Sequence, residues 1–200
     1  QRQRRRIVAQ CDAVQRAERI AGEAKERSTV NIAARAFGDD MQNLIAHLRA
    51  TGQLTAGLIL RALLSGNLDL FGAALAELSG LPYGRVSALL NDRGGNGLSA
   101  LLRRAGLPES TYAAFRVALE ASHEVGYVDS GDGAARLHRR MVERVLTHCE
   151  TDHTAAEPLL ILLRRFATES AREDARMFCE ELAAEDALAA LPYEDDLVAA

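Results

Sequence analysis

Tryptophan is absent from this 200-residue chain, and aromatic residues make up only 4% of it. The core must therefore be built from Leu, Ala, Val and Ile. Apolar residues reach 48%, enough for a chain of this length to bury roughly 70% of its unfolded surface. Ala and Leu favour helix, and the β-branched residues that favour strands are sparse. Composition alone thus predicts an all-α protein without a sheet.

Cysteine is also scarce, with only Cys11, Cys149 and Cys179 in the chain. An odd, scattered set of this kind is typical of a reducing compartment, so we expect a cytoplasmic protein. Apolar runs such as residues 158–163 are too short to span a membrane. No apolar segment of signal-peptide length follows the basic start. The chain begins at Gln1 and not at Met, which suggests a piece of a longer protein.

Lysine is nearly missing, since Lys25 is the only one among 24 basic residues. With 28 acidic residues the net charge is −4. The charge is uneven: residues 1–50 hold 10 basic and 6 acidic side chains, and residues 51–200 hold 14 and 22. An acidic body with a mildly basic start makes general nucleic-acid binding unlikely.

Apolar residues recur at helical spacing through most of the chain, in segments separated by Gly, Pro and Asn. We expect about eight or nine helices, at residues 4–26, 32–50, 54–64, 68–79, 82–91, 98–105, 109–124, 134–149, and from 158 to about 188 or to a break near Ser170. The first two could form a hairpin or a dimer seam. The segment 54–64 is apolar on all sides, so we expect it to be the most buried helix, with Thr55 as its N-cap.

One phrase occurs twice, 26 residues apart, as Gly80-Leu81-Pro82 and Gly106-Leu107-Pro108. Each Gly and Pro is predicted to form a corner between two short helices. Repeated corners indicate helical hairpins stacked in a repeat-like, HEAT-like bundle. We expect three parts: helices and hairpin core at 1–126, C-terminal helices packing on the core at 134–190, and a frayed acidic tail at 191–200.

A helix-turn-helix pattern overlaps the first corner, at residues 70–91. Ala76, Gly80, Val86 and Leu89 have the spacing that the motif requires. Tyr83, Arg85 and Arg93 are then the candidate contacts to DNA or to a partner. Arg85 is the only basic residue from Tyr83 to Asn91, and a close-packed helical corner produces the same pattern. DNA binding by a transcription regulator is therefore the alternative interpretation.

No reaction chemistry is evident, and we expect no enzyme activity, cofactor or metal. Cys149 and His153, like His148 and Asp152, are four residues apart but lack a second ligand pair. The stretch 129–140 has Gly at two calcium-ligand positions and Arg140 at the last. Residues 94–97 lack the Lys of a phosphate-binding loop.

The central part resembles an alphaproteobacterial family catalogued as domain of unknown function 2336, over about residues 35–125. The resemblance is carried by Leu54-Thr55, residues 60–64, Gly66-Asn67, Phe71, residues 73–76, Gly80-Leu81-Pro82, Arg85-Val86 and residues 105–108. It implies an all-helical, repeat-like protein and supplies no catalytic residues.

Together these features predict a non-enzymatic α-helical module that binds another protein, of unknown identity, or a second copy of itself. Stacked hairpins offer grooves into which partner helices fit.

Overall fold

The computed structural model describes residues 2–36, 38–92, 96–125, 132–151 and 156–189, with the side chains of residues 2–14, 96, 125, 132–137 and 187–189 left aside. Within these residues the chain is all-α, with nine helices and no strand. The helices are α1 (Arg2–Ala33), α2 (Asp39–Ala50), α3 (Ala56–Leu64), α4 (Leu68–Ser79), α5 (Tyr83–Asn91), α6 (Asn96–Arg104), α7 (Tyr112–Val125), α8 (Asp132–Thr151) and α9 (Glu157–Ala189), and a 3₁₀ turn spans Glu109–Thr111.

The most buried helix is α3, as its apolar sequence predicts. Every residue from Leu58 to Leu64 is buried. Around it pack α1, α4, α7 and α8, while α2 lies on α4 and α8 on α9. Thr55 accepts a hydrogen bond from the Leu58 N–H at 3.1 Å, so the predicted N-cap is confirmed.

The core is filled by leucines and three phenylalanines. The Phe71 and Phe115 rings stack with their centroids 5.8 Å apart, which joins α4 to α7. Burying side chains of this size contributes about 1.5–3 kcal/mol each. A core of this kind holds the helices together, and Cys149 is buried within it whereas Cys179 is exposed.

Both Gly-Leu-Pro corners have the same backbone conformation. Gly80 and Gly106 lie at φ 66° and 74°, in the left-handed region that favours glycine. Pro82 and Pro108 follow in extended conformation and precede helical turns. The corners therefore match as local structures, and consecutive helices stack on one another.

Three predicted helix boundaries are wrong by three residues or more. The first helix ends at Ala33 and not at residue 26. The second helix begins at Asp39 and not near Ile32, because α1 continues to Ala33 with Val30 and Ala33 buried against the body. Asp39 and Asp40 occupy the first turn of α2, where carboxylates are favoured by the free N–H groups. The segment after Pro108 starts as a 3₁₀ turn, and α7 begins only at Tyr112.

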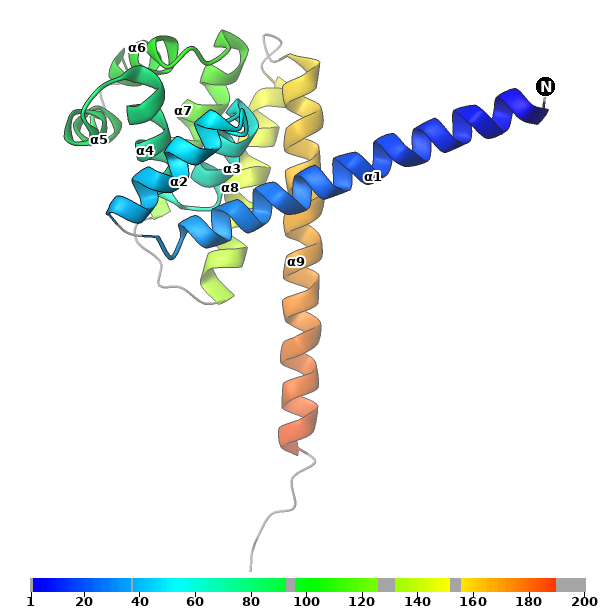
Figure 1. The fold of residues 1–200 in the computed structure, drawn as a ribbon. Coiled ribbons are helices and arrows are strands. Elements are labelled where there is room, and N and C mark those ends of the chain that lie inside the picture. The colour runs from blue at the N-terminus through cyan, green and yellow to red at the C-terminus, as the bar shows by residue number, and fades with distance from the viewer. Residues whose placement is uncertain (1, 37, 93–95, 126–131, 152–155, 190–200) are drawn as a thin grey trace, which may run out of the picture.

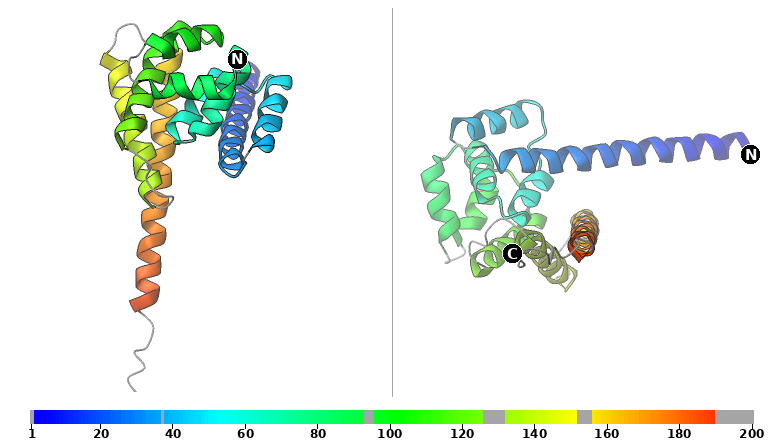
Figure 2. Two further views of the ribbon diagram at one scale, coloured as in Figure 1. Left: turned by 90° about the vertical axis from the view of Figure 1, so that its left-hand side faces the viewer. Right: turned by 90° about the horizontal axis from the view of Figure 1, so that it is seen from below.

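The last helix is unbroken, since α9 runs through Ser170 to Ala189. Figure 1 shows that α1 and α9 are the two long helices that extend out of the helical body, in different directions. The views in Figure 2 show the same two extensions from the side and from below. Residues 126–131 and the predicted tail at 191–200 lie outside the described residues.

Candidate interaction site

A buried arginine joins the two long helices to the core. Arg61 lies in α3, and its side chain is only 6% exposed. Its Nη1 donates to Glu169 Oε2 of α9 at 2.8 Å, and its Nε donates to Glu26 Oε2 of α1 at 3.3 Å. The guanidinium also stacks on Phe166, 4.3 Å from the ring centroid. A buried cation needs such partners, because an unpaired charge in the core is costly.

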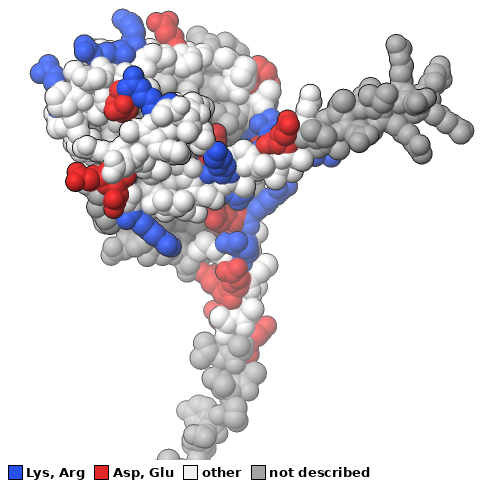
Figure 3. Space-filling view, in the orientation of Figure 1, with Lys and Arg blue, Asp and Glu red and all other residues white. Residues whose placement is uncertain are grey.

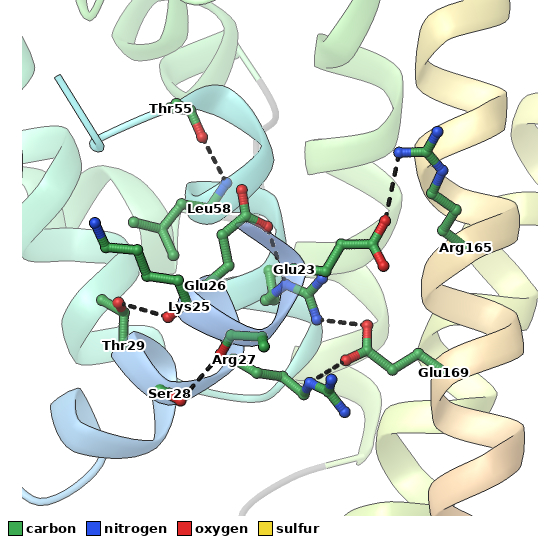
Figure 4. A network of polar contacts seen from close by, with 12 residues as sticks. Glu23, Lys25, Glu26, Arg27, Ser28, Thr29, Thr55, Leu58, Arg165 and Glu169 are labelled. Carbon is green, nitrogen blue, oxygen red and sulfur yellow. Dashed lines mark hydrogen bonds and ion pairs between the residues drawn. The ribbon is translucent and has the colours of Figure 1, made fainter. Parts of the chain in front are cut away.

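Further ion pairs connect α1 and α9 directly beside Arg61. Arg27 Nε lies 2.5 Å from Glu169 Oε1, and Arg165 Nη1 lies 3.5 Å from Glu23 Oε1. Figure 4 shows both pairs bridging the two helices. The network therefore fixes how α1 crosses α9.

Beyond this crossing, α1 and α9 border an open cleft of about 740 Å³. Basic side chains outnumber acidic ones in its walls, which hold seven arginines and three glutamates. Figure 3 shows blue and red side chains interspersed where the two helices meet. The lining residues are Arg16, Arg19, Ile20, Glu23, Arg27, Ile161, Arg164, Arg165, Thr168, Glu169, Arg172, Glu173 and Arg176. The cleft thus has an excess of positive charge on a chain whose net charge is −4.

Several cleft arginines are already paired, whereas Arg16 and Arg172 have no ion pair with any residue that the structure describes. Arg164 pairs with Glu150 and Glu157, and Arg176 with Glu180. Among the described residues, no carboxylate pairs with Arg16 or Arg172, and both are exposed. Two apolar side chains also face the cleft, Ile20 at 57% exposed and Ile161 at 41%. A ligand that fits must offer both negative charge and apolar surface.

The predicted contact residues lie elsewhere. Tyr83 and Arg85 are both on the exposed side of α5, and Arg93 lies outside the described residues. Tyr83 Oη donates to Asp69 Oδ1 at 3.0 Å, and its ring covers Gly72. Partial burial, and then the hydrogen bond and charge of Asp69, raise the pKa of Tyr83 above 10.0. Gly80, Pro82 and Tyr83 line a second groove of about 730 Å³ between α2, α4 and α5.

The remaining residues that the sequence singled out lie outside this cleft or outside the described residues. Gly106 and Pro108 form the second corner. Cys149 is buried, and His153 and Asp152 lie outside the described residues. Across the described ranges, no three His, Cys, Asp or Glu side chains gather as metal ligands would. None of the described helices is both long and apolar enough to cross a membrane.

Sequence reasoning missed Arg61 and the cleft. One signal could have revealed Arg61, because a single Arg inside an otherwise apolar helix must be buried and therefore paired. The cleft has no local signal, since its walls are about 145 residues apart in the chain.

Comparison with known proteins gives one match. The family model described as "Uncharacterised protein conserved in bacteria (DUF2336)" matches residues 1–155. No curated protein and no solved structure matches the chain.

Proposed function

Because this chain belongs to DUF2336, a family of uncharacterised bacterial proteins, we propose its function from the geometry. It is a non-enzymatic, cytoplasmic module that binds another protein in the cleft between α1 and α9. The observation that supports this proposal is the cleft itself, where exposed Ile20 and Ile161 lie among arginines. Single exposed apolar residues are common on protein surfaces, but two that face one charged cleft suit a partner of mixed character.

The walls of the cleft are held in place, which lowers the entropic cost of binding. The Arg61 network ties both walls to the most buried helix. A partner segment with acidic and apolar residues on one helical face would neutralise Arg16 and Arg172 and cover Ile20 and Ile161.

Site-specific photo-crosslinking in the native cells tests this function. A benzophenone amino acid at Ile20 is expected to give covalent adducts with a protein, because the side chain faces the cleft. The same amino acid at the exposed Ala88 on α5 is the matched control and should give far less adduct. Equal or absent adducts at the two positions would contradict a protein-binding cleft.

DNA reading by α5 is the alternative, and the left-handed Gly80 corner is the observation in its favour. Arg85 is its single base-contact candidate of known position. Fluorescence anisotropy with duplex DNA at low salt distinguishes the two functions. Salt-sensitive binding that is lost in R85A would favour the regulator, and we expect no such binding.

A further inference from the structure

The far end of α9 offers negative charge and apolar surface, the two properties that a ligand of the cleft requires. After Arg176 every charged residue of the chain is acidic, namely Glu180, Glu181, Glu185, Asp186, Glu194, Asp195 and Asp196. The first four lie on α9, where it extends beyond the helical body (Figure 1). Phe178 and Leu182, four residues apart on the same face, are 58% and 46% exposed. This part of α9, residues 177–189, is called the acidic end below.

Building on the proposed function, we propose that the partner is a second copy of this chain. The acidic end of one copy lies in the α1–α9 cleft of the other, and the reverse contact forms at the same time. Acidic side chains then approach Arg16 and Arg172, which have no carboxylate partner among the described residues. Phe178 and Leu182 cover Ile20 and Ile161.

The order of charges along α9 sets the direction of this contact. Cleft-lining residues occupy 161–176, and the acidic end follows directly at 177–189. At 1.5 Å per residue the two parts are each about 20–24 Å long. Two antiparallel α9 helices therefore place both acidic ends against both arginine-lined parts at once. A parallel pair would place acidic end against acidic end.

The assembly stops at two copies, because each copy offers its one cleft and its one acidic end to the same partner. This is the self-complementary contact of a two-fold dimer. The acidic residues at 190–200 of the same chain are the competing occupant. Binding by them would not depend on protein concentration, whereas dimerisation must.

Sedimentation velocity with paired charge reversals tests the proposal. R16E/R172E makes the cleft acidic, and E185R/D186R makes the end of α9 basic. Among the described residues none of these four side chains has an ion-pair partner, so neither variant breaks a described pair inside the fold. Reductant is present throughout because Cys179 is an exposed free thiol.

We expect the unaltered chain to dimerise in a concentration-dependent manner and to dissociate as salt is raised. The dimer dissociation constant of each variant alone should be at least about a hundredfold higher than that of the unaltered chain, because attraction becomes repulsion in both clefts. Mixing the two variants in equal amounts should restore a dimer, since the acidic cleft of one then meets the basic end of the other. The control R103E/E109R, which reverses an exposed pair outside the cleft, should dimerise like the unaltered chain.

A monomeric unaltered chain, or variants that do not recover on mixing, would overturn the proposal. A change in the sedimentation of R16E/R172E that does not depend on protein concentration would also overturn it. That result would show that the chain's own last residues occupy the cleft. If a variant fails to fold, the salt dependence of the unaltered dimer still tests the proposal. A dimer that does not weaken as salt is raised would contradict it, because an uncharged interface would not weaken with salt. Crosslinks from Ile20 to a different protein, with a monomeric chain, would remove only self-association and leave the proposed function standing.

Discussion

At the scale of single residues, Arg61 has the largest effect on how the molecule is built. It is the one buried side chain of α3 that carries a charge, and it meets carboxylates from helices at both ends of the chain. Buried charge pairs seldom add net stability compared with apolar residues, but removal of one partner is destabilising. Arg61 therefore determines the positions of α1 and α9 more than it adds to the stability of the core.

Arg61→Leu is expected to lower the free energy of unfolding by about 2–3 kcal/mol. Glu169 and Glu26 would lose a counter-charge, although Arg27 still pairs with Glu169. The measurement is urea-induced unfolding followed by circular dichroism. Arg49→Leu, which breaks only the exposed pair with Glu77, should cost less than about 1 kcal/mol. Equal losses of unfolding free energy in the two variants would show that the buried network stabilises the fold no more than an exposed ion pair does.

Tyr83 gives the chain a dependence on alkaline pH. Its pKa is raised in the folded protein by partial burial and by Asp69, so folding favours the protonated phenol. That stability is fully present below the unfolded value near 10 and is lost as pH rises through the folded pKa. Tyr83→Phe should therefore flatten the fall in stability above about pH 10. The effect is small because the side chain is 44% exposed, and an unchanged slope in thermal unfolding would contradict it.

At the scale of elements, the two Gly-Leu-Pro corners decide where the short helices turn. Gly80 ends α4 in the left-handed region, and its N–H donates to Ala76 O at 2.9 Å. Gly106 ends α6 in the same region. A side chain at these positions is strained, whatever space surrounds it.

Gly80→Ala and Gly106→Ala are each expected to cost about 1 kcal/mol of unfolding free energy. Gly84→Ala is the matched control, because Gly84 lies within α5, has no positive φ, and has open space where a Cβ would be. It should leave stability unchanged or raise it by up to about 1 kcal/mol. Thermal unfolding of the three variants measures the difference, and a destabilised G84A would argue against a backbone cause.

At the scale of the whole molecule, a helical body carries two long extensions. The body is organised around α3, which packs against α1, α4, α7 and α8 and contacts α9 through Arg61. The acidic end of α9 leaves this body and exposes Phe178 and Leu182 (Figure 1). Local stability should follow this difference in packing.

Hydrogen exchange is expected to be slowest in α3 and much faster in residues 177–189, whose described side chains are exposed or half-buried. Mass spectrometry of peptides from the two regions measures this. Raising the protein concentration should slow exchange in 177–189 and leave α3 unchanged, because the dimer covers only the former. Protection of 177–189 as strong as that of α3 at every concentration would contradict the extended position of α9.

The sequence by itself determined the helices and the corners, because periodic leucines, N-caps and Gly-Pro signals act over a few residues. It identified α3 as the most buried helix and located α4 without error, whereas it placed the start of α2 too early. Only the tertiary structure decided that Arg61 joins α1 to α9 and that arginines from residues 16–27 and 164–176 face one cleft. Charges so far apart in the chain meet only through packing of the helices between them, and no local pattern records that packing.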